Sequence, residues 1–205
     1  MPGKMSNGLQ FIGIAGTNGA GKDLLGEILA KRHDYWFISV TELLREECRK
    51  RGLPVEREHL REISAQWRRE HGYGVLVDKA VEAFNALPDK DRYAGVVAAS
   101  LRNPGEVERT HELGGKVVWL DADPQVRYER IQANAASRGR QAEDTKTFEQ
   151  FLAEEEAEMH PPAGADKAVL DMAGVKDQAD IFLQNNTGDI EAFARDAAQA
   201  LGVTK

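Results

Sequence analysis

A glycine-rich segment between a short apolar run and an amphipathic pattern constrains the fold of this 205-residue chain more than any other feature. Residues 16–22 read Gly-Thr-Asn-Gly-Ala-Gly-Lys, residues 9–15 before them are mainly apolar, and apolar residues at helical spacing follow over 22–31. Because glycines allow the backbone to turn sharply, this order predicts a strand that leads at once into a helix. Such a unit is typical of proteins that alternate strands and helices around a parallel sheet.

The composition of this turn favours the binding of phosphate groups. It fits the first seven positions of the Walker A pattern, in which backbone N–H groups, a helix N-terminus and a lysine surround phosphate oxygens. The alternative is an ordinary glycine-rich turn with a surface lysine, but the strand before the motif and the helix after it favour the phosphate loop. The residues predicted to bind phosphate are Gly16, Thr17, Asn18, Gly19, Ala20, Gly21 and Lys22. Lys22 is also a predicted catalytic residue.

The residue after the loop lysine, Asp23, departs from the Walker A pattern, which has a Ser or Thr hydroxyl there as a magnesium ligand. A carboxylate is also a hard oxygen ligand, so Asp23 is predicted to hold Mg²⁺ directly or through water. The alternative is a site that binds nucleotide but has lost turnover. Aspartate also occurs at this position in phage-type deoxynucleoside monophosphate kinases and animal-type phosphomevalonate kinases, whose loops this one resembles. That resemblance favours an active site.

Apolar runs and helical patterns alternate along the rest of the chain. The predicted strands span residues 9–15, 35–39, 94–100, 116–120 and 181–183. Asn103 and Thr147 each begin a helix-capping pattern. The alternation predicts an α/β fold, a P-loop NTPase three-layer sandwich with a five-stranded parallel sheet, helices on both faces and a short lid. The length suits a single domain, residues 1–205, with an acceptor-binding helical insertion at about 41–87 and the lid at about 137–146.

The charge balance argues against several kinds of partner. The chain has 27 Lys and Arg residues against 34 Asp and Glu residues, a net charge of −7. Because nucleic acids and anionic membranes are also negative, neither is an expected partner. Cys48 is the single cysteine, which suits a reducing compartment, and no apolar run approaches the roughly 18 residues of a membrane span. The expected location is the cytoplasm, and the oligomeric state is left open.

Classes of phosphate-loop protein differ in what accompanies the loop. GTPases carry an Asn-Lys-x-Asp base reader, which this chain lacks, and motor and AAA ATPases have an apolar strand that ends in Asp-Glu, whereas residues 94–100 end in Ser100. Small-molecule kinases instead need arginines around two sets of phosphates, because phosphoryl transfer depends on positioning and charge neutralisation. Arg102 follows a central strand at its carboxyl end, where open α/β sheets bind ligands. It is a candidate acceptor-binding residue, and a surface arginine that caps a loop is the alternative.

Several segments resemble known nucleotide kinases. Residues 37–46, Phe-Ile-Ser-Val-Thr-Glu-Leu-Leu-Arg-Glu, resemble the segment after the second strand of adenylate-kinase-like enzymes. This resemblance implies that Arg45 holds the phosphate of the acceptor. Further segments resemble an uncharacterised archaeal group of nucleotide-kinase-like proteins, and the matches recur from Phe11 to about Phe193. These matches are residues 52–54 followed by Arg57 and Leu60, and the segments 67–72, 100–108, 127–131 and 138–140.

The same family resemblance assigns residues to the donor nucleotide and to the lid. Arg130 matches the arginine that lies over the donor base in adenylate-kinase-like enzymes. The next family arginine is Asn134 here, which moves the predicted lid catalysis to Arg138 or Arg140, and closure of such a segment would exclude water. An ordinary exposed loop is the alternative for these arginines. The chain near its end resembles the final strand and loop of dephospho-CoA-kinase-like and nucleotide kinases. By this match the donor adenine lies against Asn186, Thr187 and Gly188.

Together these residues predict a kinase that moves the γ-phosphoryl group of ATP, with Mg²⁺, to a nucleoside or deoxynucleoside monophosphate. Arg45 and Arg102 would orient this small phosphorylated acceptor. One alternative is a dephospho-CoA kinase-like activity, and another is a nucleotide-binding regulatory module without turnover. The acidic run from Glu154 to Glu156 is expected to be a solvated helix face rather than a metal site.

Overall fold

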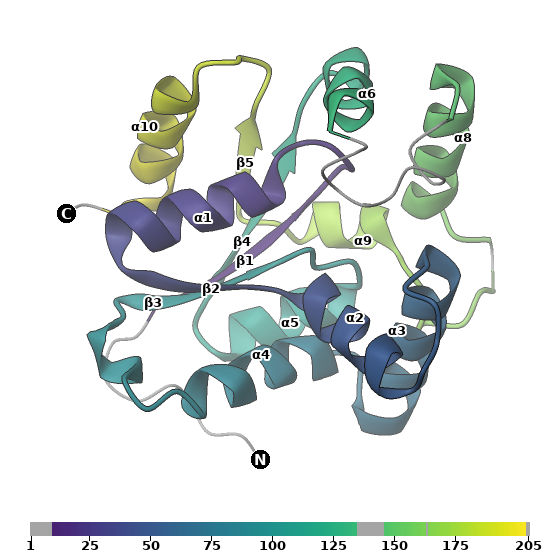
Figure 1. Cartoon of the computed structure of the whole chain (residues 1–205), viewed down its shortest axis with the longest axis horizontal. Helices are drawn as coiled ribbons and strands as arrows, with labels where there is room; N and C mark the ends of the chain where they lie inside the picture. The colour runs from purple at the N-terminus through teal and green to yellow at the C-terminus, as the bar shows by residue number, and fades with distance from the viewer. Residues whose placement is uncertain (1–9, 135–145, 163, 204–205) are drawn as a thin grey trace.

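The computed structural model describes residues 10–134, 146–162 and 164–203. Its centre is a five-stranded sheet in the order β2-β3-β1-β4-β5, in which all neighbouring strands are parallel (Figure 1). The strands are β1 (Gln10–Gly16), β2 (Tyr35–Ser39), β3 (Gly95–Ala99), β4 (Lys116–Asp121) and β5 (Ile181–Gln184). This confirms the predicted α/β fold with a five-stranded parallel sheet, and each predicted strand end lies within one residue of the observed end. The predicted short lid at about 137–146 lies almost entirely outside the described residues.

The central strand, β1, determines where a site can form. Ile14 of β1 is opposite Ala99 of β3 on one side and opposite Val118 of β4 on the other. Because all the strands run in the same direction, their carboxyl ends meet at one edge of the sheet. The loop after β1 therefore lies beside the residues that follow β3 and β4, as expected for a ligand site in an open α/β sheet.

Helices cover both faces of the sheet, as predicted (Figure 1). On one face lie α1 (Lys22–His33) and α10 (Ile190–Leu201), which contact each other. On the other face lie α4 (Val75–Asn85), α5 (Pro104–Glu112) and α9 (Met172–Asp177). The short helix α9 was not predicted, because the segment before β5 was interpreted as a loop. Its first turn is capped by the side chain of Asp171, which accepts a hydrogen bond from the N–H of Gly174.

The strand sequences are continuous apolar runs because both faces of the sheet are buried. Ile12 and Ile14 of β1 pack in the core beneath α1 and α10, whereas Phe11 of β1 packs in the core on the side of α4 and α5. Trp119 of β4 lies in the same core as Phe11 and is 1% exposed. Two hydrophobic cores therefore fix the sheet between its helical layers, and they hold β1 and its loop in place.

Two further helices, α2 (Val40–Lys50) and α3 (Arg57–His71), pack against each other and add Val40, Leu44 and Trp67 to the core on the α4 side. A short 3-10 helix, Lys90–Arg92, precedes β3. The predicted insertion at 41–87 thus comprises α2, α3 and α4, and its role in binding an acceptor stays a prediction.

Two helices, α6 (Pro124–Ala133) and α8 (Phe148–Met159), contact each other. In the sequence they lie before and after residues 135–145, which the structure does not describe. Tyr128 of α6 packs against Phe148 and Phe151 of α8. Thr147 forms a capping box with Gln150, and Asn103 does the same with Glu106 at the start of α5, so both predicted caps are present. Over the described ranges, none of the helices combines the length and apolar character that crossing a membrane requires.

Candidate nucleotide and acceptor site

The loop between β1 and α1 has a backbone that only glycine adopts readily at several positions. Gly16, Gly19 and Gly21 have φ angles of 134°, 83° and 99°. A Cβ atom on Gly16 would lie 1.9 Å from the carbonyl oxygen of Leu120 in β4. The glycines of the motif therefore have two functions, since they form the turn and they allow the loop to approach β4 closely.

Lys22, the first residue of α1, extends back across this loop. Its ammonium group donates hydrogen bonds to the carbonyl oxygens of Gly16 at 2.9 Å and Thr17 at 2.7 Å. The pKa of Lys22 is lowered from 10.5 to about 7, chiefly by burial and then by the positive charge of Arg102, while Asp23 acts in the opposite direction. A phosphate group beside Lys22 would favour the charged ammonium form, so anion binding and protonation are coupled at this site.

A carboxylate at the end of β4 holds the loop from the other side. Asp121 accepts a 2.6 Å hydrogen bond from the hydroxyl of Thr17 and a 2.8 Å hydrogen bond from the N–H of Ala122. Thr17 is buried, so this contact fixes its side chain against the sheet. Asp121 was not identified from the sequence. The signal was its position directly after an apolar strand, at the edge where the carboxyl ends of the strands meet.

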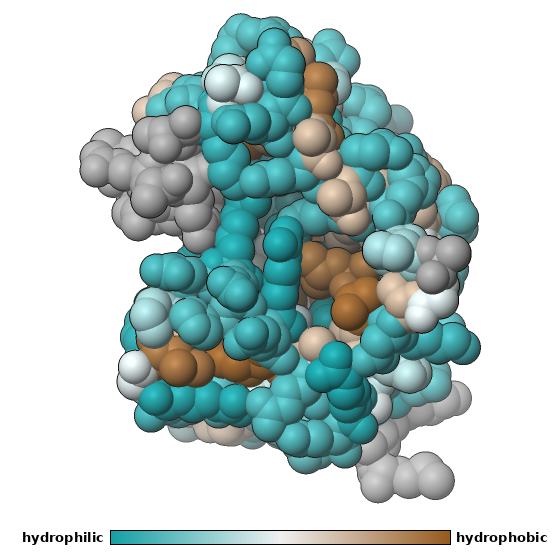
Figure 2. All heavy atoms as spheres, turned by 90° about the vertical axis from the view of Figure 1, so that its right-hand side faces the viewer, coloured by the Kyte–Doolittle hydropathy of each residue, from teal (hydrophilic) through white to brown (hydrophobic). Residues whose placement is uncertain are grey.

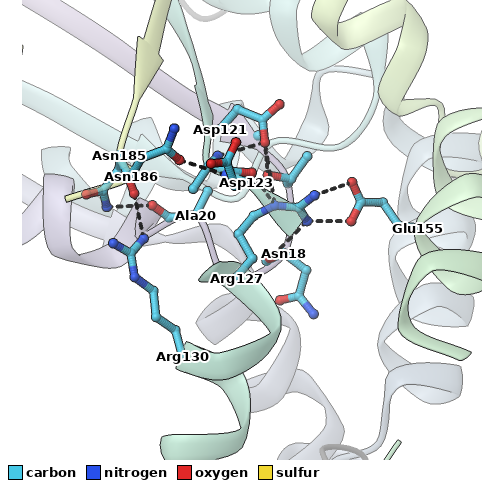
Figure 3. A network of polar contacts seen from close by, with 12 residues as sticks. Asn18, Ala20, Asp121, Asp123, Arg127, Arg130, Glu155, Asn185 and Asn186 are labelled. Atoms are coloured by element: carbon cyan, nitrogen blue, oxygen red, sulfur yellow. Dashed lines mark hydrogen bonds and ion pairs between the residues drawn. The ribbon is translucent and has the colours of Figure 1, made fainter. Parts of the chain in front are cut away.

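Arg127 of α6 contacts both the loop and α8 (Figure 3). It is 2% exposed, and it donates hydrogen bonds to the carbonyl oxygens of Ala122 at 2.7 Å and Asn18 at 3.3 Å. Both terminal nitrogens of its guanidinium group also contact the carboxylate of Glu155 in α8. Arg127 therefore links α6, α8 and the phosphate loop.

Arg130 lies one turn further along α6 and contacts the loop after β5 (Figure 3). Its guanidinium group donates to the carbonyl oxygens of Asn185 at 2.7 Å and Thr187 at 3.0 Å. The side chain of Asn185, which was not assigned from the sequence, donates a 2.8 Å hydrogen bond to the carbonyl oxygen of Ala20. Asn186 accepts a 2.7 Å hydrogen bond from the N–H of Asp123. Arg130, the phosphate loop and the predicted adenine loop are thus joined.

A cleft of about 820 Å³ opens above these residues. It contains most of the residues that the sequence predicts to bind nucleotide or acceptor. The described exceptions are Gly16, Thr17 and Ala20, which are buried, and Asn186, whose side chain contacts the backbone of Asp123. Arg138 and Arg140, predicted to act in the lid, lie outside the described residues. The predicted site residues that line the cleft are Asn18, Gly19, Gly21, Lys22, Asp23, Arg45, Arg102, Arg130, Thr187 and Gly188.

A second, smaller pocket of about 90 Å³ adjoins this cleft and shares with it Asn18, Thr41, Arg45, Ser100 and Arg102. The face of the molecule that carries α3 and α8 is largely hydrophilic, with hydrophobic atoms in a hollow near its middle (Figure 2). The lining of the pocket likewise combines hydrophilic side chains, which include five arginines, with aliphatic side chains. The arginines are Arg45, Arg57, Arg61, Arg68 and Arg102, and the aliphatic residues are Val40, Leu44, Val55, Leu60, Leu76 and Leu170.

Glutamates of α8 pair with arginines of this pocket. Glu158 accepts a 2.7 Å hydrogen bond from Arg61 and a 2.8 Å hydrogen bond from Arg102, and Glu154 lies 3.3 Å from Arg57. Burial acts to raise the pKa of Glu158, but Arg102 and the hydrogen bond from Arg61 outweigh this effect and hold the pKa below its usual value. The expectation of a solvated acidic face was wrong for Glu154 and Glu155, which form ion pairs with arginines.

The backbone of Arg102 is held by Glu106, which also forms a buried ion pair with Arg68. Glu106 of α5 accepts a 2.7 Å hydrogen bond from Arg68 of α3, and both side chains are at most 1% exposed. The other carboxylate oxygen of Glu106 accepts from the backbone N–H groups of Arg102 at 2.6 Å and Asn103 at 3.2 Å. The capping glutamate of α5 therefore also fixes the backbone that presents Arg102 to the cleft.

The residues around Asp23 fit one kind of magnesium site. Asp23 is exposed, follows Lys22 directly in the chain and lines the cleft. In the described part of the chain, no three His, Cys, Asp or Glu residues cluster as a metal-binding group. Mg²⁺ commonly uses one or two carboxylates together with substrate phosphates and water, so a single carboxylate beside a phosphate loop suits it.

A phosphate loop at the centre of a parallel sheet, with arginines at the neighbouring strand end, defines a P-loop protein of the kinase type. A family model described as an AAA domain matches residues 12–158. A UPF0200 protein of Pyrococcus abyssi is 31% identical over 186 residues, which cover 89% of this chain and 94% of the relative. A UPF0200 protein of Methanocaldococcus jannaschii is 28% identical over 90% of this chain and 94% of the relative. The chain belongs to the UPF0200 family of AAA-domain P-loop proteins.

This membership confirms the resemblance to an archaeal nucleotide-kinase-like group. The third strand is followed by Ser100 rather than by the Asp-Glu pair expected of AAA ATPases, and the match to an AAA-domain model identifies the domain without showing ATPase activity. Ser100 does line both the cleft and the adjoining pocket, so the strand end keeps its place in the site.

Solved structures share the fold. A shikimate kinase from Bacteroides thetaiotaomicron superposes with a TM-score of 0.61 at 16% identity, covering 94% of this chain and 98% of the other. A shikimate kinase from Acinetobacter baumannii in complex with shikimate has a TM-score of 0.55 at 18% identity, covering 93% and 92% of the two chains. At these identities the comparison supports the kinase-like P-loop fold alone.

Proposed function

We propose that this protein transfers the γ-phosphoryl group of ATP to a small phosphorylated acceptor, with a nucleoside monophosphate as the preferred acceptor. One observation carries the proposal: an arginine-lined pocket opens into the same cleft as the phosphate loop and shares Arg45, Ser100 and Arg102 with it. Two adjacent sites of positive charge suit a reaction in which two phosphate groups must meet.

The donor half of the reaction rests on the loop and its neighbours. The backbone N–H groups of residues 16–21 and the ammonium of Lys22 would hold the triphosphate, as in other helix N-terminal phosphate sites. Asp23 would hold Mg²⁺, which when bound offsets negative charge on the phosphates. The adenine would lie beside Arg130 and residues 187–188, which line the same cleft.

The acceptor half rests on the arginine pocket. Arg45 and Arg102 would orient the acceptor's phosphate, because guanidinium groups match phosphate geometry with paired hydrogen bonds. Aliphatic side chains such as Leu44 and Leu60 in the same pocket suit the flat, partly apolar face of a base. The sequence alone assigns Arg138 and Arg140 to neutralising charge on the transferred group.

An acceptor panel tests the proposal. The full chain would be assayed for ADP release from ATP and Mg²⁺ with each ribo- and deoxynucleoside monophosphate, with dephospho-CoA and with shikimate, which is bound in one of the structures of similar fold. We expect ADP release to depend on at least one monophosphate and to be lost in Lys22→Met. Dependence on dephospho-CoA or shikimate alone would overturn the choice of acceptor, and nucleotide binding without acceptor-dependent release would overturn the kinase itself.

A further inference from the structure

A carboxylate of the protein lies between two arginines of the acceptor pocket. One oxygen of Glu158 is 2.7 Å from Arg61 of α3, and the other is 2.8 Å from Arg102, which follows β3. Glu158 is in the last turn of α8, and its side chain is 17% exposed. Two guanidinium groups that converge on one carboxylate form the kind of fork that also binds a phosphate group.

This fork is part of the pocket that adjoins the phosphate loop. Arg61, Arg102 and Glu158 all line that pocket, and Arg102 also lines the larger cleft beside Lys22. The charges of both Arg102 and Glu158 influence the pKa of Lys22. An anion bound by the fork would therefore lie near the phosphate loop and its lysine.

We propose that Arg61 and Arg102 form a binding subsite for a phosphomonoester dianion, and that Glu158 occupies this subsite until the acceptor's phosphate displaces it. The inference rests on the proposed function, because it names the residues that hold the acceptor's phosphate. Arg61 thus joins Arg45 and Arg102, the two arginines that the sequence already assigned to the acceptor. Glu158 becomes a residue that determines which acceptors bind. Acceptors that carry a dianion displace Glu158, whereas neutral acceptors leave it in place.

The local charge balance supports this exchange. Two guanidinium groups and one carboxylate leave a local charge of about +1, and a dianion in place of the carboxylate brings it to about zero. The second negative charge thus strengthens the attraction to both arginines. Displacing Glu158 also breaks its hydrogen bonds with Arg61 and Arg102, and the weaker attraction of a singly charged anion does not offset this loss. The pair of arginines and the glutamate together therefore select for doubly charged groups.

The contrast with a neighbouring ion pair shows that Glu158 is less firmly held. Glu106, which pairs with Arg68, is fully buried and also accepts hydrogen bonds from two backbone N–H groups, so it cannot leave without losing several partners. Glu158 is near the end of a helix in which only Phe151 is buried. A rotation of the Glu158 side chain toward solvent therefore breaks its contacts with Arg61 and Arg102 but removes no buried apolar side chain of α8.

Binding of inorganic phosphate to the full chain tests this subsite by calorimetry. We expect Glu158→Gln to bind phosphate at least tenfold more tightly than the wild type. Glu158→Asp keeps the negative charge but shortens the side chain, which weakens its contacts with Arg61 and Arg102. It should therefore also tighten phosphate binding if phosphate has to displace the carboxylate. If the carboxylate acts only through its negative charge, Glu158→Asp should leave phosphate affinity unchanged. The matched control is Glu156→Gln on the same helix, whose side chain is 76% exposed and should leave phosphate affinity within twofold.

A second substitution shows where the additional phosphate affinity of Glu158→Gln arises. It is needed because the phosphate loop is also expected to bind inorganic phosphate. In Arg61→Gln/Glu158→Gln the extra affinity should disappear, while thermal unfolding confirms that both variants are folded. An unchanged affinity in Glu158→Gln, or a gain that survives the loss of Arg61, would overturn the subsite. If the gain appears but no acceptor supports ADP release, the subsite stands and the proposed kinase function fails. If acceptor-dependent release occurs without the gain, the kinase function stands and the subsite fails.

Discussion

Lys22 combines two properties at the scale of a single residue, since it belongs to the phosphate loop and has a pKa lowered to about 7. A bound triphosphate favours the charged ammonium form and raises this pKa. Below about pH 7 the lysine is already protonated, so binding takes up no proton there. Above that pH the free protein has lost the proton, and binding must restore it, so affinity falls as pH rises.

We therefore expect ATP binding at about pH 8.5 to take up close to one proton, with little uptake at about pH 6.5 from Lys22. Calorimetry in two buffers of different ionisation enthalpy measures this uptake directly. Lys22→Arg serves as the control, because a guanidinium group stays charged throughout this range. Equal binding heats in both buffers at the higher pH would contradict the assignment of Lys22.

Gly16 gives a second prediction at the residue scale. Alanine there meets the Leu120 carbonyl oxygen at 1.9 Å and adopts a φ of 134°, so Gly16→Ala should lower the free energy of unfolding by about 3 kcal/mol. Gly188→Ala is the matched control, since its added Cβ has no neighbour within 4 Å, and it should change stability by less than about 0.5 kcal/mol. Chemical denaturation measures both, and similar values for the two variants would argue against this loop geometry.

At the scale of elements, α8 contacts the rest of the molecule through an aromatic cluster, through Met159, which packs against the hydrophobic core, and through glutamates. Phe148 and Phe151 pack against Tyr128 of α6, and Glu155 pairs with the buried Arg127 beneath the phosphate loop. The helix thus contacts both Arg127, which holds the phosphate loop, and the arginine-lined pocket. Arginines account for Glu154, Glu155 and Glu158 of this helix, whereas Glu156 is exposed to solvent.

Removing the carboxylate of Glu155 should destabilise this arrangement. Glu155→Ala leaves Arg127 buried with fewer partners, so we expect a loss of about 2 kcal/mol in the free energy of unfolding. Glu156→Ala is the control from the adjacent position, where the side chain is exposed, and about 0.5 kcal/mol or less is expected there. Equal effects of the two substitutions in urea denaturation would mean that the ion pair contributes little.

Strands, caps and the phosphate loop could be predicted because their causes are local. Continuous apolar runs indicate strands buried on both faces, and the loop motif carries its own glycines and lysine. Arg102 was found because the strand-end rule needs only the order of the elements. Asp121 and Asn185 were missed because their contacts join residues 104 and 165 positions apart. The inward orientation of Glu154 and Glu155 likewise depends on how α8 packs.

At the scale of the whole molecule, the net charge of −7 conceals a positive site. The arginines of the arginine-lined pocket come from α2, α3 and the segment after β3, and glutamates of α2 and α8 partly offset them. Positive charge is therefore concentrated around one pocket of an acidic protein. The overall composition argues against large anionic partners, whereas the positions of these charges support the proposed small anionic ligands.

Nucleotide binding should stabilise the whole fold, because the loop joins α1, β1, β4 and α6. ATP with Mg²⁺ at about 100 times its dissociation constant adds about 2.7 kcal/mol, which corresponds to a rise of roughly 5–10 °C in the melting temperature. Calorimetric or fluorescence melting measures the shift. Lys22→Met should lose more than half of it, and an equal shift in the variant would show that the nucleotide binds elsewhere.

The most direct test follows the phosphoryl group itself. The wild-type chain would be incubated with Mg²⁺, ATP carrying a radiolabelled γ-phosphate and each nucleoside monophosphate, and the products separated. We predict that the label moves onto a monophosphate to give the corresponding diphosphate, and that Lys22→Met and Arg102→Gln strongly reduce this transfer. Label that remains in ATP, or appears only as inorganic phosphate whatever the acceptor, would contradict the proposed phosphoryl transfer.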